Sequence, residues 1–157
     1  PKPSSAASDV YKRQIKESIK NILSLGAIPI INENDSVSTE EIEFGDNDQL
    51  SGNVAKLICS DLLIILTDQD GVFDKNPTMN KNAKLLNEIK FTDVEKLEIE
   101  FGKAGEYGRG GMKTKLLAAE NYLNPNNKMY IANGKSENIL LDILSENRVG
   151  TVIRLAN

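Results

Sequence analysis

Residues 62–71 read LLIILTDQDG, and this stretch sets the fold class of the chain. Its first five residues form an apolar run of the kind expected for a strand buried inside a parallel sheet. Thr67 and Asp68 follow at the carboxyl end of that strand. Ligands of open parallel sheets bind at this edge. The stretch therefore predicts an α/β protein with a polar site at one rim of its sheet.

The segments on both sides of this strand alternate between helix and strand patterns. Ile15, Ile19 and Leu23 repeat at helical spacing and predict a helix over residues 14–25. A capping box at Thr92 predicts the start of another short helix. The other expected elements are a strand at 27–32, a hairpin or flap at 36–44, a helix from Asp46 or Asp48 to about residue 60, helices at 112–123 and 136–145, and strands at 128–132 and 149–154. Alternation of this kind predicts a mainly parallel sheet between helices.

Composition narrows the classes of function. The chain has 157 residues, of which 39% are hydrophobic and 27% charged, so it can form one α/β-sized domain. A net charge of −4 argues against partners such as nucleic acid or an anionic membrane. No apolar run approaches the roughly 20 residues of a membrane span. Because the chain has no histidine, Ser-His-Asp and Cys-His catalysis are excluded.

Two features bear on the cellular compartment of the chain and on the boundary of its domain. Cys59 is the single cysteine, so it cannot form an internal disulfide, which fits a reducing cytoplasm, and we expect it to be buried in the core. Residues 1–14 are rich in Pro, Ser and Ala and lack periodicity. They are expected to be a linker or a non-native segment, with a partial domain over 15–157 whose N-terminal part lies outside the chain.

Three acidic clusters lie at the ends of predicted elements: NEND at 32–35, GDND at 45–48 and TDQDG at 67–71. Each one alone could be a strand exit, a tight turn or a helix cap. One carboxylate suffices for a cap, however, so the others could orient a lysine, bind an ammonium group or hold Mg²⁺ through water. Their joint occurrence favours a single site for phosphoryl transfer to a small molecule.

The stretch GRGGMKTK at 108–115 is a second candidate for phosphate binding. Glycines before a helix let backbone amides approach a phosphate closely, and lysines in the first turn add positive charge. The spacing is not that of a Walker A motif. A flexible connector remains the alternative interpretation.

Taken together, the motifs IPIINEND (28–35), FGDNDQLS (44–51), LLIILTDQDG (62–71) and GGMKTK (110–115) resemble those of the glutamate 5-kinases (γ-glutamyl kinases) of the amino acid kinase family. The resemblance covers about residues 15–154 and implies a three-layer sandwich. It implies transfer of the γ-phosphoryl group of ATP to the side-chain carboxylate of L-glutamate, with Mg²⁺ as cofactor, in the cytoplasm, at the start of proline synthesis, by a full-length enzyme that is a homo-oligomer.

The resemblance also implies roles for individual residues. Asp48 and Lys115 would be catalytic, with Asp48 organising the active-site lysines and Lys115 stabilising the transferred group. The implied glutamate ligands are Asn32, Asp35 and Asn47, and the implied ATP ligands are Thr67, Asp68, Arg109, Gly110, Gly111, Met112, Lys113, Thr114 and Lys115. No protein metal ligand is expected.

Two departures from the family pattern qualify these expectations. Arg109 stands where the family usually has Thr. The Lys-x-Gly strand that begins family members does not occur before Ile15, so this polypeptide alone is expected to have little or no kinase activity. The alternatives are another member of the family, a nucleotide-binding remnant without catalysis, or a structural α/β domain. A wide separation of Asp48 from Lys115 would favour binding without catalysis.

Overall fold

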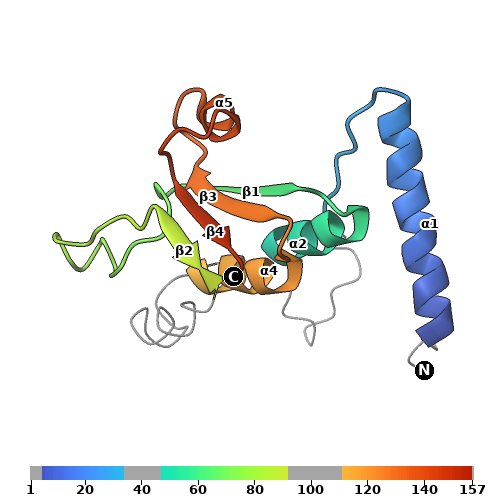
Figure 1. Ribbon diagram of the computed structural model, residues 1–157, viewed down its shortest axis with the longest axis horizontal. Coiled ribbons are helices and arrows are strands. Elements are labelled where there is room, and N and C mark those ends of the chain that lie inside the picture. The colour runs from blue at the N-terminus through green and yellow to red at the C-terminus, as the bar shows by residue number, and fades with distance from the viewer. Residues whose placement is uncertain (1–4, 34–46, 92–110, 157) are drawn as a thin grey trace.

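The computed structural model describes residues 5–33, 47–91 and 111–156 of the chain. Within them, a four-stranded sheet has helices α2 and α4 on one face and helix α5 on the other (Figure 1). The strands follow the order β1-β3-β4-β2. The elements are α1 (Ser5–Ser24), α2 (Asn47–Ile58), β1 (Leu62–Thr67), β2 (Glu88–Lys90), α4 (Met112–Tyr122), β3 (Lys128–Asn133), α5 (Ile139–Leu144) and β4 (Thr151–Arg154).

The sheet is mostly parallel, as predicted. β1 pairs parallel with β3, and β2 pairs parallel with β4, whereas β3 and β4 are antiparallel. Leu63 and Ile65 of β1 belong to the core under α2 and α4. Leu62 and Ile64 pack against the smaller core beneath α5. Because both faces of β1 are covered, its sequence is an uninterrupted apolar run.

Two predictions at the beginning of the chain are wrong. α1 starts at Ser5, nine positions before the predicted start at residue 14, so the helix also covers most of residues 1–14, where the sequence shows no helical periodicity. The strand expected at 27–32 does not form, and the sheet of the described residues includes no part of it. A strand needs a neighbouring strand for its backbone hydrogen bonds, and none of the strands in the described residues pairs with this segment. The domain boundary at residue 14 stays a prediction.

The prediction for Cys59 is also wrong, because its side chain is exposed. α2 ends at Ile58, and Cys59 has a left-handed backbone with φ of 58°. The change of backbone conformation takes Cys59 off the helical repeat that buries Ala55. Its Sγ instead lies 3.4 Å from the Nζ of Lys16 on α1.

The other elements differ from the predictions mainly in length. α5 begins at Ile139, three residues after the predicted start, and the three-residue strand β2 was not predicted. The expected flap at 36–44, the helix begun by Thr92 and most of the Gly-rich loop lie outside the described residues. No helix in the described parts of the chain has the length and apolarity that crossing a membrane requires.

Tyr122 ends α4 inside the core, with 2% of its surface exposed. Its hydroxyl donates to the Ser60 carbonyl oxygen at 2.9 Å. Burial raises the pKa of Tyr122, and the nearby Asp61 carboxylate adds to this, while a hydrogen bond from the Ser60 hydroxyl acts in the opposite direction. The folded protein therefore holds the phenolic proton more tightly than the unfolded chain does.

This raised pKa predicts an alkaline loss of stability. The contribution of Tyr122 should be constant below pH of about 10 and should fall as the pH rises further, because only the unfolded chain then releases the proton. Tyr122→Phe is expected to cost about 1 kcal/mol at pH 8 through the lost hydrogen bond. Urea denaturation between pH 8 and 11 should show that the free energies of unfolding of the parent chain and of the Tyr122→Phe variant converge as the pH rises. A constant difference over this range would contradict the prediction.

Candidate functional site

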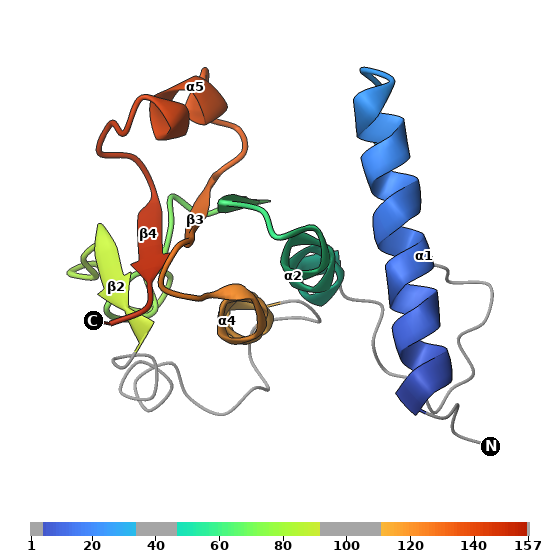
Figure 2. The same ribbon diagram turned by 45° about the vertical axis from the view of Figure 1, so that its right-hand side comes forward.

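The helices α2 and α4 lie side by side on one face of the sheet (Figure 2). Each of them runs directly into a strand of the parallel pair, α2 into β1 and α4 into β3. A helix that leads back into a parallel strand begins near the carboxyl edge of the sheet. The first turns of both helices therefore lie at the rim where the sequence predicts a site.

A close contact sets the spacing of the two helices. A Cβ atom on Gly52 would lie 3.0 Å from the carbonyl oxygen of Ala118, so only glycine fits without a shift. Farther along the two helices, the side-chain amide of Asn121 on α4 donates a hydrogen bond to Oδ1 of Asn53 on α2. Its Oδ1 accepts a hydrogen bond from the Nζ of Lys56, also on α2. These contacts fix the register of α2 against α4, and with it the distance between residues in their first turns.

Asp48 and Lys115 meet in those first turns. The Nζ of Lys115 lies 2.7 Å from Oδ2 of Asp48, and the two side chains are only 11% and 17% exposed. The hydroxyl of Thr114 lies 2.9 Å from the same Oδ2 and 2.8 Å from the carbonyl oxygen of Gly111. The predicted proximity of Asp48 and Lys115 is thus confirmed, and the arrangement expected for binding without catalysis is not found.

The charges at this position suit an anion. The amino ends of two helices carry partial positive charge, and the ammonium group of Lys115 adds a full one that the paired carboxylate of Asp48 offsets. Asp48 fixes the direction of the lysine ammonium group, which otherwise has a flexible four-carbon stem. The helix ends and Lys115 can thus present positive charge to a phosphoryl group from a fixed geometry.

Asn32 and Asn47 form a second contact near the start of α2. The side-chain amide of Asn47 donates to Oδ1 of Asn32 at 3.0 Å, across fifteen positions of sequence. Residues of the first and second acidic clusters therefore meet. Asp35 lies outside the described residues.

Thr67 and Asp68 lie at the predicted end of β1. The Thr67 hydroxyl lies 3.2 Å from Oδ1 of Asp68, whose side chain is exposed. Their place at the carboxyl edge agrees with the sequence. The structure therefore places Thr67 and Asp68 on the rim where the first turns of α2 and α4 also lie.

The remaining predicted ATP ligands lie around the start of α4. Gly111 is the residue immediately before the helix, Lys113 is exposed, and Met112 packs against the main core. A contact of Met112 with ATP would therefore use its backbone. Arg109 and Gly110 lie outside the described residues.

Sequence reasoning missed two residues at this rim. Asn133 pairs in register with Thr67, and its amide donates to Oδ1 of Asp70 at 2.8 Å. Thr151 is fully buried, and its hydroxyl accepts from the amide of Val72 at 2.8 Å and donates to the carbonyl oxygen of Leu86. Thr151 thereby fastens the segment after the TDQDG turn. Asn133 could have been predicted as a site residue from its position at the end of a strand. No local sequence pattern indicates a role for Thr151.

A shallow cavity lies elsewhere and holds none of the predicted site residues. It measures about 230 Å³ and is lined by residues near the starts of β2 and β4, together with Tyr130. The contacts between α2 and α4 define the candidate site instead. The described residues contain no group of three or more Asp, Glu or Cys side chains arranged to hold a metal ion.

Comparison with known proteins indicates the family of the chain. The sequence profile described as "Amino acid kinase family" matches residues 3–133. A glutamate 5-kinase of Listeria innocua is 42% identical over 147 residues, which make up 91% of this chain and 53% of that protein. A glutamate 5-kinase of Caldanaerobacter subterraneus is 47% identical over 133 residues, which make up 85% of this chain and 36% of that protein. The chain thus spans about half or less of the length of these relatives.

Solved structures share the fold. UMP kinase from Bacillus anthracis superposes with a TM-score of 0.64 at 22% identity, covering 88% of this chain and 50% of that one. Isopentenyl phosphate kinase from T. acidophilum gives a TM-score of 0.58 at 24% identity, covering 88% and 52%. The profile match extends over most of the chain and includes α1, both site helices and β3. The chain therefore belongs to the amino acid kinase family.

Proposed function

We propose that this chain supplies the nucleotide side of a glutamate 5-kinase. The reaction moves the γ-phosphoryl group of ATP to the side-chain carboxylate of L-glutamate and releases ADP. The Asp48–Lys115 pair, held between the first turns of α2 and α4, is the observation that carries the proposal. The identity of 40% or more to glutamate 5-kinases supports this choice of acceptor.

The chemistry requires positioning and positive charge more than proton transfer. A glutamate carboxylate is already ionised at neutral pH, so it can attack the γ-phosphorus without a general base. The bond from the γ-phosphorus to the bridging oxygen breaks as the new bond forms, and negative charge is spread over the transferring oxygens. In our proposal Lys115 faces those oxygens. Asp48 holds the ammonium group of Lys115 in place, and the hydroxyl of Thr114 holds the carboxylate of Asp48.

The two substrates would approach from different sides of this pair. Asn32 and Asn47, linked by their amides, would bind glutamate together with Asp35. Thr67, Asp68 and the segment from Arg109 to Lys115 would bind ATP. Mg²⁺ would enter with the nucleotide phosphates, because it commonly uses one or two carboxylates besides phosphate oxygens. Asp68 is exposed and could serve as such a carboxylate, directly or through water.

A cytoplasmic location and self-association of the whole enzyme belong to the same proposal. Both rest on the kind of enzyme that the chain resembles.

The test uses the chain alone and in a chimera. The chain alone should form little or no glutamyl hydroxamate from ATP, L-glutamate and hydroxylamine. A chimera in which this chain replaces the aligned segment of the Listeria innocua glutamate 5-kinase should form it readily and selectively. The acceptor panel contains L-glutamate, L-aspartate, UMP and isopentenyl phosphate, since the last two belong to relatives in fold.

The outcomes separate the candidate functions. Selective use of L-glutamate supports the proposal, and preference for another acceptor assigns the chain to a different reaction of the family. A folded chimera that binds ATP but transfers no phosphoryl group would indicate a nucleotide-binding remnant. Robust activity of the chain alone would contradict the expectation that it needs further polypeptide.

A further inference from the structure

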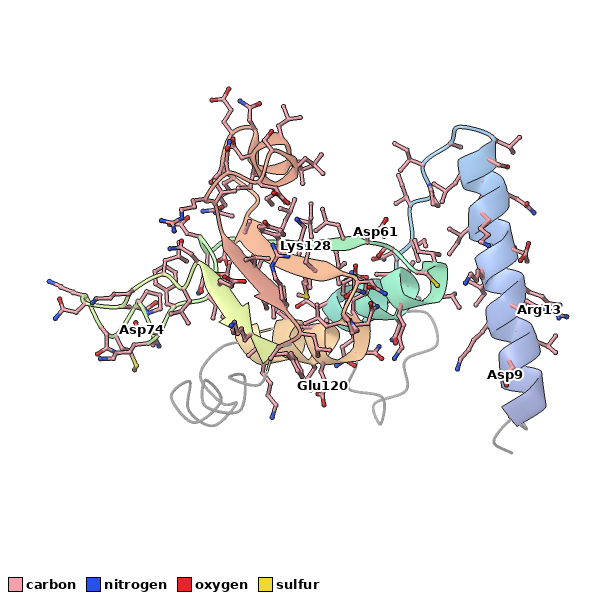
Figure 3. All side chains as sticks on the ribbon, in the orientation of Figure 1. Asp9, Arg13, Asp61, Asp74, Glu120 and Lys128 are labelled. Carbon is pink, nitrogen blue, oxygen red and sulfur yellow. The ribbon has the colours of Figure 1, made fainter. Side chains whose placement is uncertain are left out.

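The turn at residues 67–71 joins β1 to a segment that extends to one side of the sheet. This segment leads to β2, and Asp74 lies on it (Figure 3). A segment that extends away from the sheet cannot hold the turn against the rim, so the turn depends on contacts with neighbouring strands. At its far end, the amide of Val72 donates to the hydroxyl of Thr151 at 2.8 Å.

Asn133 makes the contact between the turn and β3. The register pairs of β1 and β3 end at Thr67 and Asn133, and the amide of Gly134 donates to the carbonyl oxygen of Thr67 at 2.8 Å. The side-chain amide of Asn133 donates to Oδ1 of Asp70, also at 2.8 Å. The connection between the two strands thus continues past their last pair, into the turn that carries Asp68.

A third contact fixes which end of the Asn133 side chain faces Asp70. Its Oδ1 accepts from the backbone amide of Lys135 at 3.0 Å. A backbone N–H group can only donate, so the side-chain oxygen must face Lys135 and the NH₂ group must face the carboxylate. The carbonyl oxygen of Asn133 also accepts from the amide of Ser136 at 3.1 Å. Asn133 is therefore fastened to the loop after β3 and meets Asp70 from a fixed position.

We propose that Asn133 is a positioning residue for the nucleotide. It acts through Asp70, because their hydrogen bond directs the turn from which Thr67 and Asp68 would contact ATP. The Thr67 hydroxyl lies 3.2 Å from Oδ1 of Asp68, so a shift of the turn would displace both side chains together. Asn133 itself contacts no substrate. The inference rests on the proposed nucleotide site, and it holds whichever acceptor the kinase phosphorylates.

The hydrogen-bond pattern predicts that aspartate fails at position 133 although it has the size of asparagine. Asn133→Asp keeps the acceptor for Lys135 but sets a second carboxylate against that of Asp70, and like charges at this distance repel. The double variant Asn133→Asp/Asp70→Asn restores the bond in the opposite direction. The amide introduced at position 70 then donates to the carboxylate introduced at position 133.

The test measures ATP binding by the chimera described above, with a non-hydrolysable ATP analogue and calorimetry. Asn133→Asp should weaken binding of the analogue about 10-fold, since a hydrogen bond to a charged group contributes about this factor. The KM for ATP should rise by the same factor, and the KM for L-glutamate should change less than about twofold, which a general loss of folded protein would not produce. The double variant should bind the analogue within about threefold of the parent chimera.

Asn147→Asp is the matched control. The amide of Asn147 donates to Oδ1 of Asp142 at 2.8 Å, so the two pairs share their chemistry and their distance. Asn147 follows Glu146, which bonds Lys128 at the end of β3 opposite to the rim. Asn147→Asp should therefore leave binding of the analogue unchanged. Urea denaturation of each variant measures the accompanying loss of stability.

Three results would overturn the positioning role. One is unchanged binding of the analogue by the Asn133→Asp variant, and a second is an equal loss in the Asn147→Asp control. The third is a double variant as weak as Asn133→Asp, because Asn133 would not then act through its bond to Asp70. A parent chimera that binds the analogue but phosphorylates another acceptor would overturn the proposed reaction alone. A parent chimera that binds no nucleotide would overturn both.

Discussion

Lys115→Met should lower the free energy of unfolding by about 2–4 kcal/mol and should reduce phosphoryl transfer by the chimera at least ~1000-fold. The loss of stability follows from burial, because the substitution takes the cationic partner away from a carboxylate that is 17% exposed. The loss of activity follows from the position of Lys115 beside the proposed phosphoryl group. Urea denaturation of the chain and hydroxamate formation by the chimera measure the two effects.

A double-mutant cycle tests whether Asp48 and Lys115 act as a pair. Asp48→Asn removes the negative charge while keeping the shape of the side chain, and it should also destabilise the protein. The double variant should recover much of the loss, with a coupling energy of about 1.5 kcal/mol or more. Both residues make further interactions, so the cycle, and not either single substitution, isolates their mutual contribution.

The pair formed by Lys128 and Glu146 is the matched control. Its Nζ and Oε1 atoms are also 2.7 Å apart, but Glu146 is 71% exposed. Lys128 is the first residue of β3, and this end of the strand lies opposite to the rim of the proposed site. Lys128→Met should leave activity unchanged, and its coupling with Glu146 should vanish in 1 M salt, which screens exposed charges. Equal couplings for the two pairs at high salt would contradict a special role for burial at Asp48 and Lys115.

The sequence predicted those features of the site that depend on local order along the chain. An apolar run followed by Thr67 and Asp68 placed a strand and its polar end, and the acidic cluster before a helix placed Asp48 in a first turn. Parallel pairing then brings strand ends and helix starts to one rim. The expectation that Asp48 meets Lys115 followed from the family motifs and is confirmed by the 2.7 Å contact.

Contacts between distant segments explain what the sequence did not predict. The register of α2 against α4 depends on the fit of Gly52 to Ala118, which no single-sequence pattern encodes. The segment at 27–32 has the pattern of a strand, but a strand also requires a neighbour. α1 extends back to Ser5 although the predicted apolar spacing begins only at Ile15. Such contacts are properties of the packed molecule and not of a sequence window.

Gly150→Ala should cost about 3–5 kcal/mol, the largest loss of stability that we expect from adding a single methyl group. Gly150 has a φ of 63°, in the left-handed region that side chains disfavour. A Cβ atom there would lie 2.5 Å from the carbonyl oxygen of Ile131 and 2.9 Å from the Cβ of Ala132. Ile131 and Ala132 are both fully buried in β3, so neither can move away cheaply. Displacing Gly150 would also shift Thr151, which fastens Val72 to the sheet.

Gly26→Ala separates the two causes of this loss. Gly26 has a similar φ of 74°, but nothing lies within 4 Å of the position that its Cβ would take. Its substitution should therefore cost only the backbone term, about 1–2 kcal/mol. Urea denaturation of both variants and of the parent chain gives the difference, which measures the collision with β3. Equal losses in the two variants would mean that β3 moves away from the added methyl group at little cost. This would contradict the close packing of Gly150 against Ile131 and Ala132 on which the prediction rests.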